Sequence, residues 1–340
     1  MKKNNLIQKY KIRYKNEKKP NDTVLWFLFR IILSKIPFYS KIKSNKLKEK
    51  RCSYGKQDED VVYYIIRPSS FSAGLMSLYN YVVEKINYAE KNNYIPIINF
   101  RDYKNMYLYN NQKHKINSWE YWFLQPTNKD LSSIKKAKNV IICSTIDYRG
   151  YGSIEQLKNN DYILECNSII KKYIKFNKKT SDYIENELNL LIGKKKILGV
   201  KARGTDYLTL QPRHHSKVPS AEELCDIVER KMEEWGDFEG IFLATEDKLF
   251  LQCFLERFGN KIITNDCNRY ESNTKNKEIA QVFRSKHVDL NLEGLQYLTS
   301  VYLLSKCDSL ITPKVGAGVV AIKMNGCNYR NVYIYDDGSY

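Results

Sequence analysis

The chain has 340 residues, of which 43% are hydrophobic and 28% charged, a composition typical of a globular protein long enough for two ordinary domains. The net charge of +18 is uneven: residues 1–51 hold 16 Lys and Arg against three acidic residues, which gives +13 and leaves +5 for the other 289. Because proteins that bind nucleic acid more often carry their cations on the folded reading surface, a nucleic-acid partner is not expected.

The leader, residues 1–55, contains a mostly apolar stretch at 24–39 between lysine-rich flanks. The stretch is shorter than the roughly 20 apolar residues of a membrane-spanning helix, and Arg30 and Lys35 interrupt it. No small-residue cleavage site follows, so a removable signal peptide is not expected. Aromatic side chains among lysines favour an interfacial helix that binds an anionic membrane through residues 1–51, which implies a cytoplasmic protein on the inner membrane face. A helix docked on the body is the alternative.

The first half of the body has the pattern of a strand–helix–strand unit. Residues 61–66 predict a buried strand, Ser72 and Gly74 lie in the small-residue loop that follows, and apolar side chains three and four apart predict a helix from residue 75. Strands are expected at 94–100 and 140–144, and a helical segment at 161–192. The aromatic-rich residues 101–130 either form a platform for a sugar or pack beneath a long loop.

The second half alternates more regularly. Strands are predicted at 197–200, 241–244, 261–264, 309–312 and 332–335. Helices are expected after the capping box of Ser220 and Glu223, after Thr245 or Asp247, over residues 292–305 and after the glycine-containing loop 315–318. A lysine run at 194–196 indicates a linker. The alternation predicts an α/β protein with two doubly wound domains, residues 56–195 and 196–340.

Three loops of the second domain carry the polar chemistry: 203–206, 245–247 and 314–318. All leave the carboxyl ends of predicted parallel strands, where open α/β sheets bind ligands, so we expect them to face one crevice. The planar fork of Arg203 can hold two oxygens of a diphosphate. The carboxylates of Asp206, Glu246 and Asp247 can bind ribose hydroxyls, accept a proton or cap a helix. The loops together favour a nucleotide-linked substrate, whereas an Arg203–Asp206 pair that braces a turn is the alternative.

Other chemistries fit less well. The first strand is not followed by Gly-x-Gly-x-x-Gly, and the chain has no phosphate-binding Gly-Lys-Ser/Thr loop, which argues against dehydrogenases and nucleotide triphosphatases. The acidic run 58–60 precedes its strand, and His214 and His215 lack a third metal ligand. None of the eight cysteines lies in a Cys-x-x-Cys pair, so reduced thiols are expected rather than disulfides or zinc.

The segment Lys201-Ala-Arg203-Gly-Thr-Asp206-Tyr207 resembles the His-x-Arg-Arg/Gly-Thr/Gly-Asp motif of the fucosyltransferase superfamily, which includes α-1,2-, α-1,6- and protein O-fucosyltransferases. Residues 244–247 are similar to the Ala-Thr/Ser-Asp-Asp of that superfamily, and residues 303–311 to its late helix–strand segment. Ser72 to Leu75 stand at its first glycine loop. The resemblance covers residues 60–335 and is greatest to bacterial relatives of the surface-polysaccharide type.

The resemblance implies two Rossmann-like domains in the GT-B arrangement, with an acceptor-side domain at 56–195 and a nucleotide-sugar-binding domain at 196–340. It also implies the transfer of a sugar, fucose from GDP-fucose, with inversion and without a metal or cofactor. The acceptor would be a glycan or lipid-linked precursor in the biosynthesis of a capsule or lipopolysaccharide. Arg203 matches the arginine that holds the β-phosphate of the leaving nucleotide, where a fixed cation stabilises the departing charge.

The candidate residues fall into three groups. The acceptor side has Tyr207, Arg213, His214 and His215, and the catalytic candidates are Arg203, Asp206, Glu246 and Asp247, with the general base open among the three carboxylates. The candidates for donor binding are Lys201, Arg203, Gly204, Thr205, Thr245, Ser300, Lys314, Gly316, Ala317, Ser72 and Gly74.

Four positions depart from the motifs of the superfamily. Lys201 replaces its His, Gly204 the second Arg of the members that have two, Ser300 an Asp that contacts guanine in some members, and Gly316 a Ser that binds phosphate in some. These departures leave two alternatives open: a transferase that uses another nucleotide sugar, and a non-catalytic membrane-surface binding protein on a degenerate transferase fold.

Overall fold

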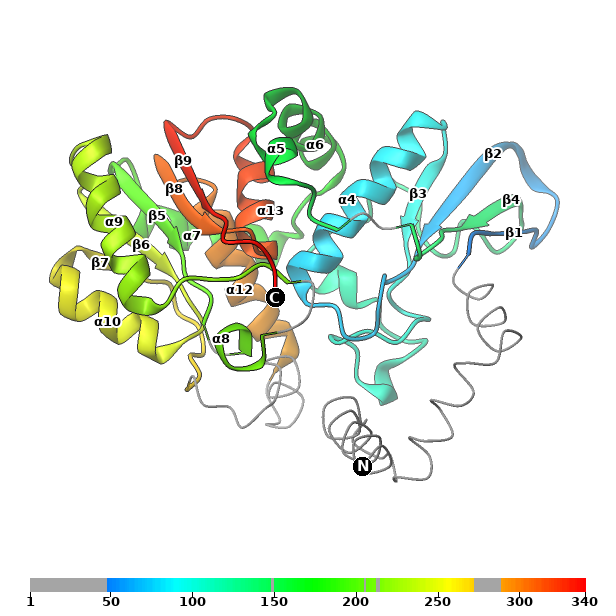
Figure 1. The fold of residues 1–340 in the computed structure, drawn as a ribbon. Coiled ribbons are helices and arrows are strands. Elements are labelled where there is room, and N and C mark those ends of the chain that lie inside the picture. Colours follow the sequence, from blue (N-terminus) through cyan, green and yellow to red (C-terminus); the bar gives the residue numbers. More distant parts are fainter. Residues whose placement is uncertain (1–47, 148–149, 205, 212–214, 272–288) are drawn as a thin grey trace, which may run out of the picture. The chain divides into compact units, whose positions relative to one another are not determined.

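The computed structural model describes residues 48–147, 150–204, 206–211, 215–271 and 289–340. The helix predicted at 24–39 lies outside these ranges, as do Thr205, Arg213 and His214. None of the described helices has the length and apolar character needed to cross a membrane. Two sheets, one of four strands and one of five, organise the unit Lys50–Tyr340 and confirm the predicted α/β class (Figure 1).

The first sheet combines parallel and antiparallel pairing. Strand β2 pairs in parallel with β3 and β4, whereas β1, which the sequence analysis did not predict, pairs antiparallel with β4. Alternate side chains of β2 enter different cores: Tyr64 and Ile66 pack with helix α4 (Leu75–Lys91), and Tyr63 and Ile65 pack on the other face. In spatial order the strands are β1 (Lys50–Cys52), β4 (Ala137–Ile142), β2 (Gln57–Ile66) and β3 (Ile95–Ile98).

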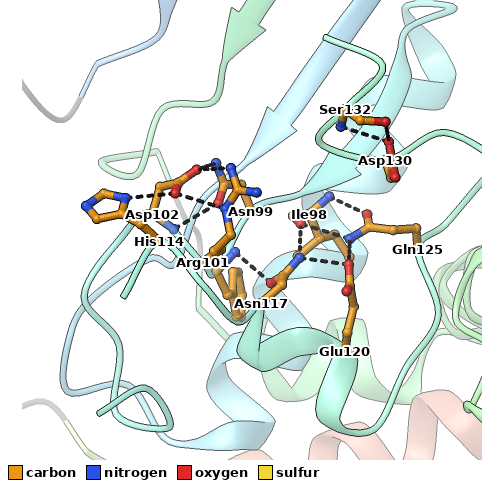
Figure 2. A network of polar contacts seen from close by, with 11 residues as sticks. Ile98, Asn99, Arg101, Asp102, His114, Asn117, Glu120, Gln125, Asp130 and Ser132 are labelled. Atoms are coloured by element: carbon orange, nitrogen blue, oxygen red, sulfur yellow. Dashed lines mark hydrogen bonds and ion pairs between the residues drawn. The ribbon is translucent and has the colours of Figure 1, made fainter. Parts of the chain in front are cut away.

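Side chains replace a neighbouring strand along the outer edge of β3 (Figure 2). The amide of Gln125 donates to the carbonyl of Ile98 at 3.0 Å, and the Ile98 N–H donates to Gln125 Oε1 at 2.9 Å. Asn117 also donates to the Ile98 carbonyl and accepts from the Phe100 N–H at 3.0 Å. These contacts pair backbone groups of the edge strand that would otherwise lack a partner. They also fix the start of the long loop that follows β3.

Asp102 fixes the same loop a few residues later (Figure 2). Burial alone would raise the pKa of its carboxyl, but hydrogen bonds from Arg101, Asn99 and His114 lower that pKa to about 2. The loop continues through two 3₁₀ helices, η1 (Asn110–Gln112) and η2 (Ser118–Tyr121). Its tryptophans at 119 and 122 are buried, which favours packing over a sugar platform for most of this aromatic segment.

The helical segment predicted at 161–192 is two helices, α6 (Asn160–Tyr173) and α7 (Lys178–Leu191), preceded by the short α5 (Ile154–Lys158). The two helices are separated before Asn177, whose side chain makes hydrogen bonds to two different segments. Its side-chain oxygen caps α7 through the Thr180 N–H at 3.0 Å, and its amide donates to the Tyr121 carbonyl at 3.0 Å. Helix α6 packs against α4 and also against α13 of the second half. The domain boundary between residues 195 and 196 stays a prediction.

The second sheet is fully parallel, and its connections reverse direction at β5. Strands β6 and β7 follow on one side of β5, and β8 and β9 lie on the other. This is a doubly wound sheet whose ligand crevice is expected at the carboxyl ends of β5 and β8. In spatial order its strands are β7 (Ile262–Ile263), β6 (Gly240–Ala244), β5 (Ile197–Lys201), β8 (Ser309–Pro313) and β9 (Asn331–Tyr335).

Helices cover both faces of this sheet (Figure 1). Helices α9 (Ala221–Trp235) and α10 (Lys248–Phe258) share a core with Leu198 and Val200 of β5. Helices α12 (Leu290–Leu304) and α13 (Gly316–Asn325) share the other core with Ile197. The capping box is confirmed, since Ser220 Oγ accepts from the Glu223 N–H at 3.1 Å. The described residues of this half also form two short helices, α8 (Asp206–Leu210) and η3 (Gly259–Lys261).

Candidate functional site

A cavity of about 380 Å³ lies at the carboxyl ends of β5 and β6, within the size range of small-molecule sites. Lys201 and Arg203 line it from the end of β5, and Thr245 and Glu246 from the loop after β6. Gly316 and Ala317 line it from the start of α13, and Ser72 and Gly74 from the loop before α4. The structure therefore brings together residues of four loops that lie far apart in the sequence.

Lys201, Glu246 and Arg203 form a linked group of charges on the cavity wall. Lys201 Nζ lies 2.6 Å from Glu246 Oε2 and 3.3 Å from the Ala244 carbonyl, and the Lys201 side chain is 3% exposed. The Arg203 guanidinium binds the other oxygen of the same carboxylate and is 19% exposed. Two cations thus share one carboxylate, which leaves one net positive charge, and the more exposed of the two cations is Arg203.

The Glu246 carboxyl is held in its charged form. Burial would raise its pKa, but the charges of Lys201 and Arg203 outweigh burial and lower the pKa to about 2. A carboxylate with so low a pKa is a weak proton acceptor at neutral pH. Of the roles open to Glu246, holding the two cations in place therefore fits better than that of a base.

One predicted acceptor-side residue contacts Arg203, and a second contacts the first. The Arg203 guanidinium carbon is 4.7 Å from the centre of the Tyr207 ring, a cation–π contact. His215 Nδ1 is 2.8 Å from the Tyr207 hydroxyl, and both residues line the cavity. Tyr207 belongs to α8, which also contains Asp206. The Arg203 guanidinium therefore contacts both the Glu246 carboxylate and an aromatic ring.

Two helices begin at the cavity. Helix α13 starts at Gly316, where an added Cβ would come within 2.6 Å of the Tyr151 hydroxyl, so glycine allows the tyrosine to approach. Helix α4 starts after Gly74, and the Leu75 N–H donates to the Tyr107 hydroxyl at 2.9 Å. Because helix N-termini carry partial positive charge, both ends add to the positive potential around Arg203.

Helix α12 supplies a wall of the cavity that the sequence analysis largely missed. Glu293, Tyr297 and Ser300 are spaced four and three apart and line the cavity from one helix face. Of the three, only Ser300 was predicted; its hydroxyl donates to Asn265 Oδ1 at 2.7 Å. The i, i+4, i+7 spacing indicated that the three residues share one helix face, but it could not show that this face lines the cavity.

Of the roles that the sequence left open for Asp247, the structure shows that of a helix cap. Its side chain is buried, and Oδ1 accepts from the N–H groups of Leu249 at 2.8 Å and Phe250 at 3.4 Å. Gly204 lies directly above it, and a Cβ at Gly204 would come within 2.4 Å of Asp247 Oδ2. Asp247 therefore stabilises α10 and the Arg203 loop from below and does not line the cavity.

Lys314 and Gly204 are not among the residues that line the cavity, and their roles in donor binding stay predictions. Asp206 occupies the first position of α8, and the structure does not describe its side chain. Within the described ranges, no group of three or more His, Cys, Asp or Glu side chains is placed to hold a metal ion. All eight cysteines have free thiols.

Comparison with solved structures identifies the fold, although no protein-family model and no curated sequence matches the chain. The NodZ α-1,6-fucosyltransferase co-crystallised with GDP aligns with a TM-score of 0.51 at 14% identity, over 81% of this chain and 96% of that one. A variant of FUT1 from Arabidopsis thaliana in complex with GDP aligns with a TM-score of 0.50 at 8% identity, over 97% of this chain and 79% of that one. The chain has the fold of the GT-B fucosyltransferases.

A second NodZ structure, the selenomethionine form of the Bradyrhizobium enzyme, gives the same result, with a TM-score of 0.50 and 14% identity over 81% of this chain and 95% of that one. At such identities the likeness establishes the architecture. Within this GT-B fold, the chemistry has to be argued from the side chains around the cavity.

Proposed function

We propose that the chain is a glycosyltransferase that takes its sugar from a nucleoside diphosphate donor, with GDP-fucose as that donor. The observation that carries the proposal is the position of Arg203. It stands at the carboxyl end of β5, beside the reversal point of the sheet, in a cavity, and Glu246 and Tyr207 hold it in place. A guanidinium fixed at such a place is suited to two oxygens of a diphosphate.

The charges of the site fit a leaving diphosphate. The bond between the anomeric carbon and the phosphate oxygen breaks, its electron pair stays on the diphosphate, and negative charge grows there. Arg203 and the N-terminus of α13 are fixed before that charge appears, so they stabilise the transition state without reorganisation. The acceptor oxygen attacks the opposite side of the anomeric carbon, which inverts its configuration. We propose that this fixed cation and the helix N-terminus serve where other transferases use a metal.

The choice of GDP-fucose is supported by the likeness of the fold. NodZ is named an α-1,6-fucosyltransferase and was co-crystallised with GDP, and the FUT1 variant is in complex with GDP. The tyrosines at 107, 151, 207 and 297 line the cavity and offer ring faces and hydroxyls of the kind that bind sugars. Ser300, which stands where some members of the superfamily carry an Asp that contacts guanine, is the residue by which another base would be preferred.

For the acceptor we propose a surface-glycan or lipid-linked precursor, handled by the acceptor-side domain at 56–195 on the inner face of the membrane. The net charge of +13 in residues 1–51 supports this placement, since a basic segment is attracted to anionic lipid. Sedimentation of the full chain with vesicles tests it. Binding to vesicles with anionic lipid, and loss of that binding in 0.5 M salt, is expected.

A nucleotide panel tests the function itself. We expect GDP to raise the melting temperature of the full chain more than UDP or CDP, since a ligand at a hundred times its Kd adds about 2.7 kcal/mol to the free energy of unfolding. GDP-fucose should also be hydrolysed slowly in the absence of an acceptor. A preference for UDP or CDP would assign another donor. A non-catalytic protein, which the four departures from the superfamily motif make the second candidate, would show neither binding nor hydrolysis.

A further inference from the structure

Two carboxyl groups of the described residues line the cavity, Glu246 and Glu293, and they are held in opposite ways. Glu246 is bound by Lys201 and Arg203. Glu293 forms no ion pair with any Lys or Arg among the described residues, and its partners are neutral. A reaction that removes a proton from a hydroxyl needs a base that is not already neutralised by cations, so the two carboxylates are suited to different tasks.

Glu293 is held in the first turn of α12 by the loop that follows β7. The side-chain amide of Asn268 donates to Glu293 Oε1, and the Tyr270 hydroxyl is 3.5 Å from both carboxylate oxygens. Tyr270 is itself anchored on the Glu246 loop, because its N–H donates to the Glu246 carbonyl at 2.8 Å. One hydrogen-bonded chain therefore connects the carboxylate on α12 to the loop that orients Arg203.

Burial raises the pKa of the Glu293 carboxyl above its ordinary value, and the nearby Asp289 adds to the rise, while the hydrogen bonds from Asn268 and Tyr270 oppose it. The pKa of Glu246 moves in the other direction. The titratable and charged groups around Glu293 are Asp289 and Tyr297 on its own helix, Cys267 and Tyr270 on the loop after β7, Tyr107 on the loop after β3, and Lys201, Arg203, Glu246 and His215 elsewhere on the cavity lining.

We propose that Glu293 is the general base of the transfer, a role that rests on the proposed function. Its carboxylate takes the proton of the acceptor hydroxyl while the acceptor oxygen forms its bond to the anomeric carbon. The bond from that carbon to the diphosphate breaks at the same time, and the electron pair leaves with the nucleotide beside Arg203. The proton then passes from Glu293 to solvent. No oxidant, reductant or further reactant is needed.

The test uses water and azide as the nucleophiles, so that the natural acceptor is not required. Water must lose a proton to react, whereas the azide anion has none to lose. In the full chain with GDP-fucose, Glu293→Gln should lower the rate of GDP release into water by a hundredfold or more. Added sodium azide should restore GDP release, with formation of the glycosyl azide, to within about threefold of the rate for the unsubstituted chain with azide, because that route needs no base.

The pH profile separates a base from a structural residue. In the unsubstituted chain, hydrolysis should fall as the pH drops through the raised pKa of Glu293, and Glu293→Gln should lose this acidic limb. Glu293→Asp, which keeps the carboxylate, should recover part of the rate and the limb. The matched control is Glu233→Gln, an exposed position of α9 outside the cavity, which should behave like the unsubstituted chain.

Binding of GDP, measured by calorimetry on each variant, distinguishes the two ways of failing. If the unsubstituted chain neither binds a nucleotide nor releases GDP, the proposed function is wrong, and the base falls with it. If the chain turns over and Glu293→Gln hydrolyses GDP-fucose at an equal rate with the acidic limb intact, only the assignment of the base is overturned. Loss of the azide reaction together with loss of the water reaction would also overturn it.

Discussion

Replacing Arg203 by Ala isolates the stabilisation of the leaving group. The side chain is 19% exposed, binds Glu246, lies over the Tyr207 ring and lines the cavity. Its removal leaves Glu246 paired with Lys201 at 2.6 Å. The carboxylate therefore keeps a partner, and we expect the variant to fold.

The magnitude follows from the charges of the site. Lys201, Arg203 and Glu246 together carry one net positive charge, and the substitution reduces it to zero. A unit charge about 4 Å from a developing charge, at an effective dielectric constant near 20, is worth about 4 kcal/mol. Because only part of a unit charge develops in the transition state, about 3 kcal/mol is expected, or roughly a hundredfold in kcat/KM. Arg203→Lys keeps the charge but loses the fork, so a smaller loss of about tenfold is expected.

The assay is release of GDP from GDP-fucose, with kcat and KM measured separately. Arg257→Ala is the matched control, because Arg257 is also paired with carboxylates, at 2.7 Å from Glu229, but lies on α10 outside the cavity. We expect that variant to hydrolyse GDP-fucose at the rate of the unsubstituted chain. Full kcat/KM in Arg203→Ala would refute the reasoning, as would an equal loss in both variants, which would point to general destabilisation.

Substitutions at three further positions test how the site is built. Gly204→Ala should cost about 1–3 kcal/mol of unfolding free energy, measured by urea titration, because its Cβ would come within 2.4 Å of Asp247 Oδ2. Asp247→Ala should lose about 1–2 kcal/mol with the α10 cap, while Asp247→Asn keeps the acceptor oxygen and should hydrolyse GDP-fucose nearly normally; a hundredfold loss there would make Asp247 catalytic after all. The pKa of Glu246 is about 2 in the folded chain, so its charged form contributes about 3 kcal/mol to the free energy of unfolding above pH 4.5. This contribution is lost as the pH falls towards 2. The difference in urea midpoint between Glu246→Gln and the unsubstituted chain should therefore narrow over that interval.

The strand ends of the second half could be predicted from the sequence because short-range patterns determine them. The buried run that ends at Lys201 places Arg203 at a carboxyl edge, and glycine at 204 provides the space that the loop needs above α10. The capping box of Ser220 and the cap at Asp247 are likewise local. Such features depend on neighbours within about four residues, and the sequence contains all of that information.

The α12 wall depends on contacts between distant segments, which a single sequence does not reveal. Glu293 meets Asn268 and Tyr270 across more than 20 residues of chain. Gly294 beside it allows Trp122 to pack closely, since a Cβ there would come within 2.1 Å of the indole ring. The break between α6 and α7 has the same origin, because Asn177 hydrogen-bonds to a loop 56 residues earlier. In each case contacts between distant segments determine a feature of the structure that local propensity does not specify.

One departure from the resembled motif becomes part of a physical unit in the structure. Lys201, which stands where the motif has His, is paired with Glu246. A buried ammonium is costly unless a carboxylate accompanies it, and the Lys201 side chain is 3% exposed. Glu246 reaches both Lys201 and Arg203 because each of its two oxygens binds one cation. The lysine therefore requires the glutamate, and together they orient the guanidinium while the three side chains keep a net charge of +1.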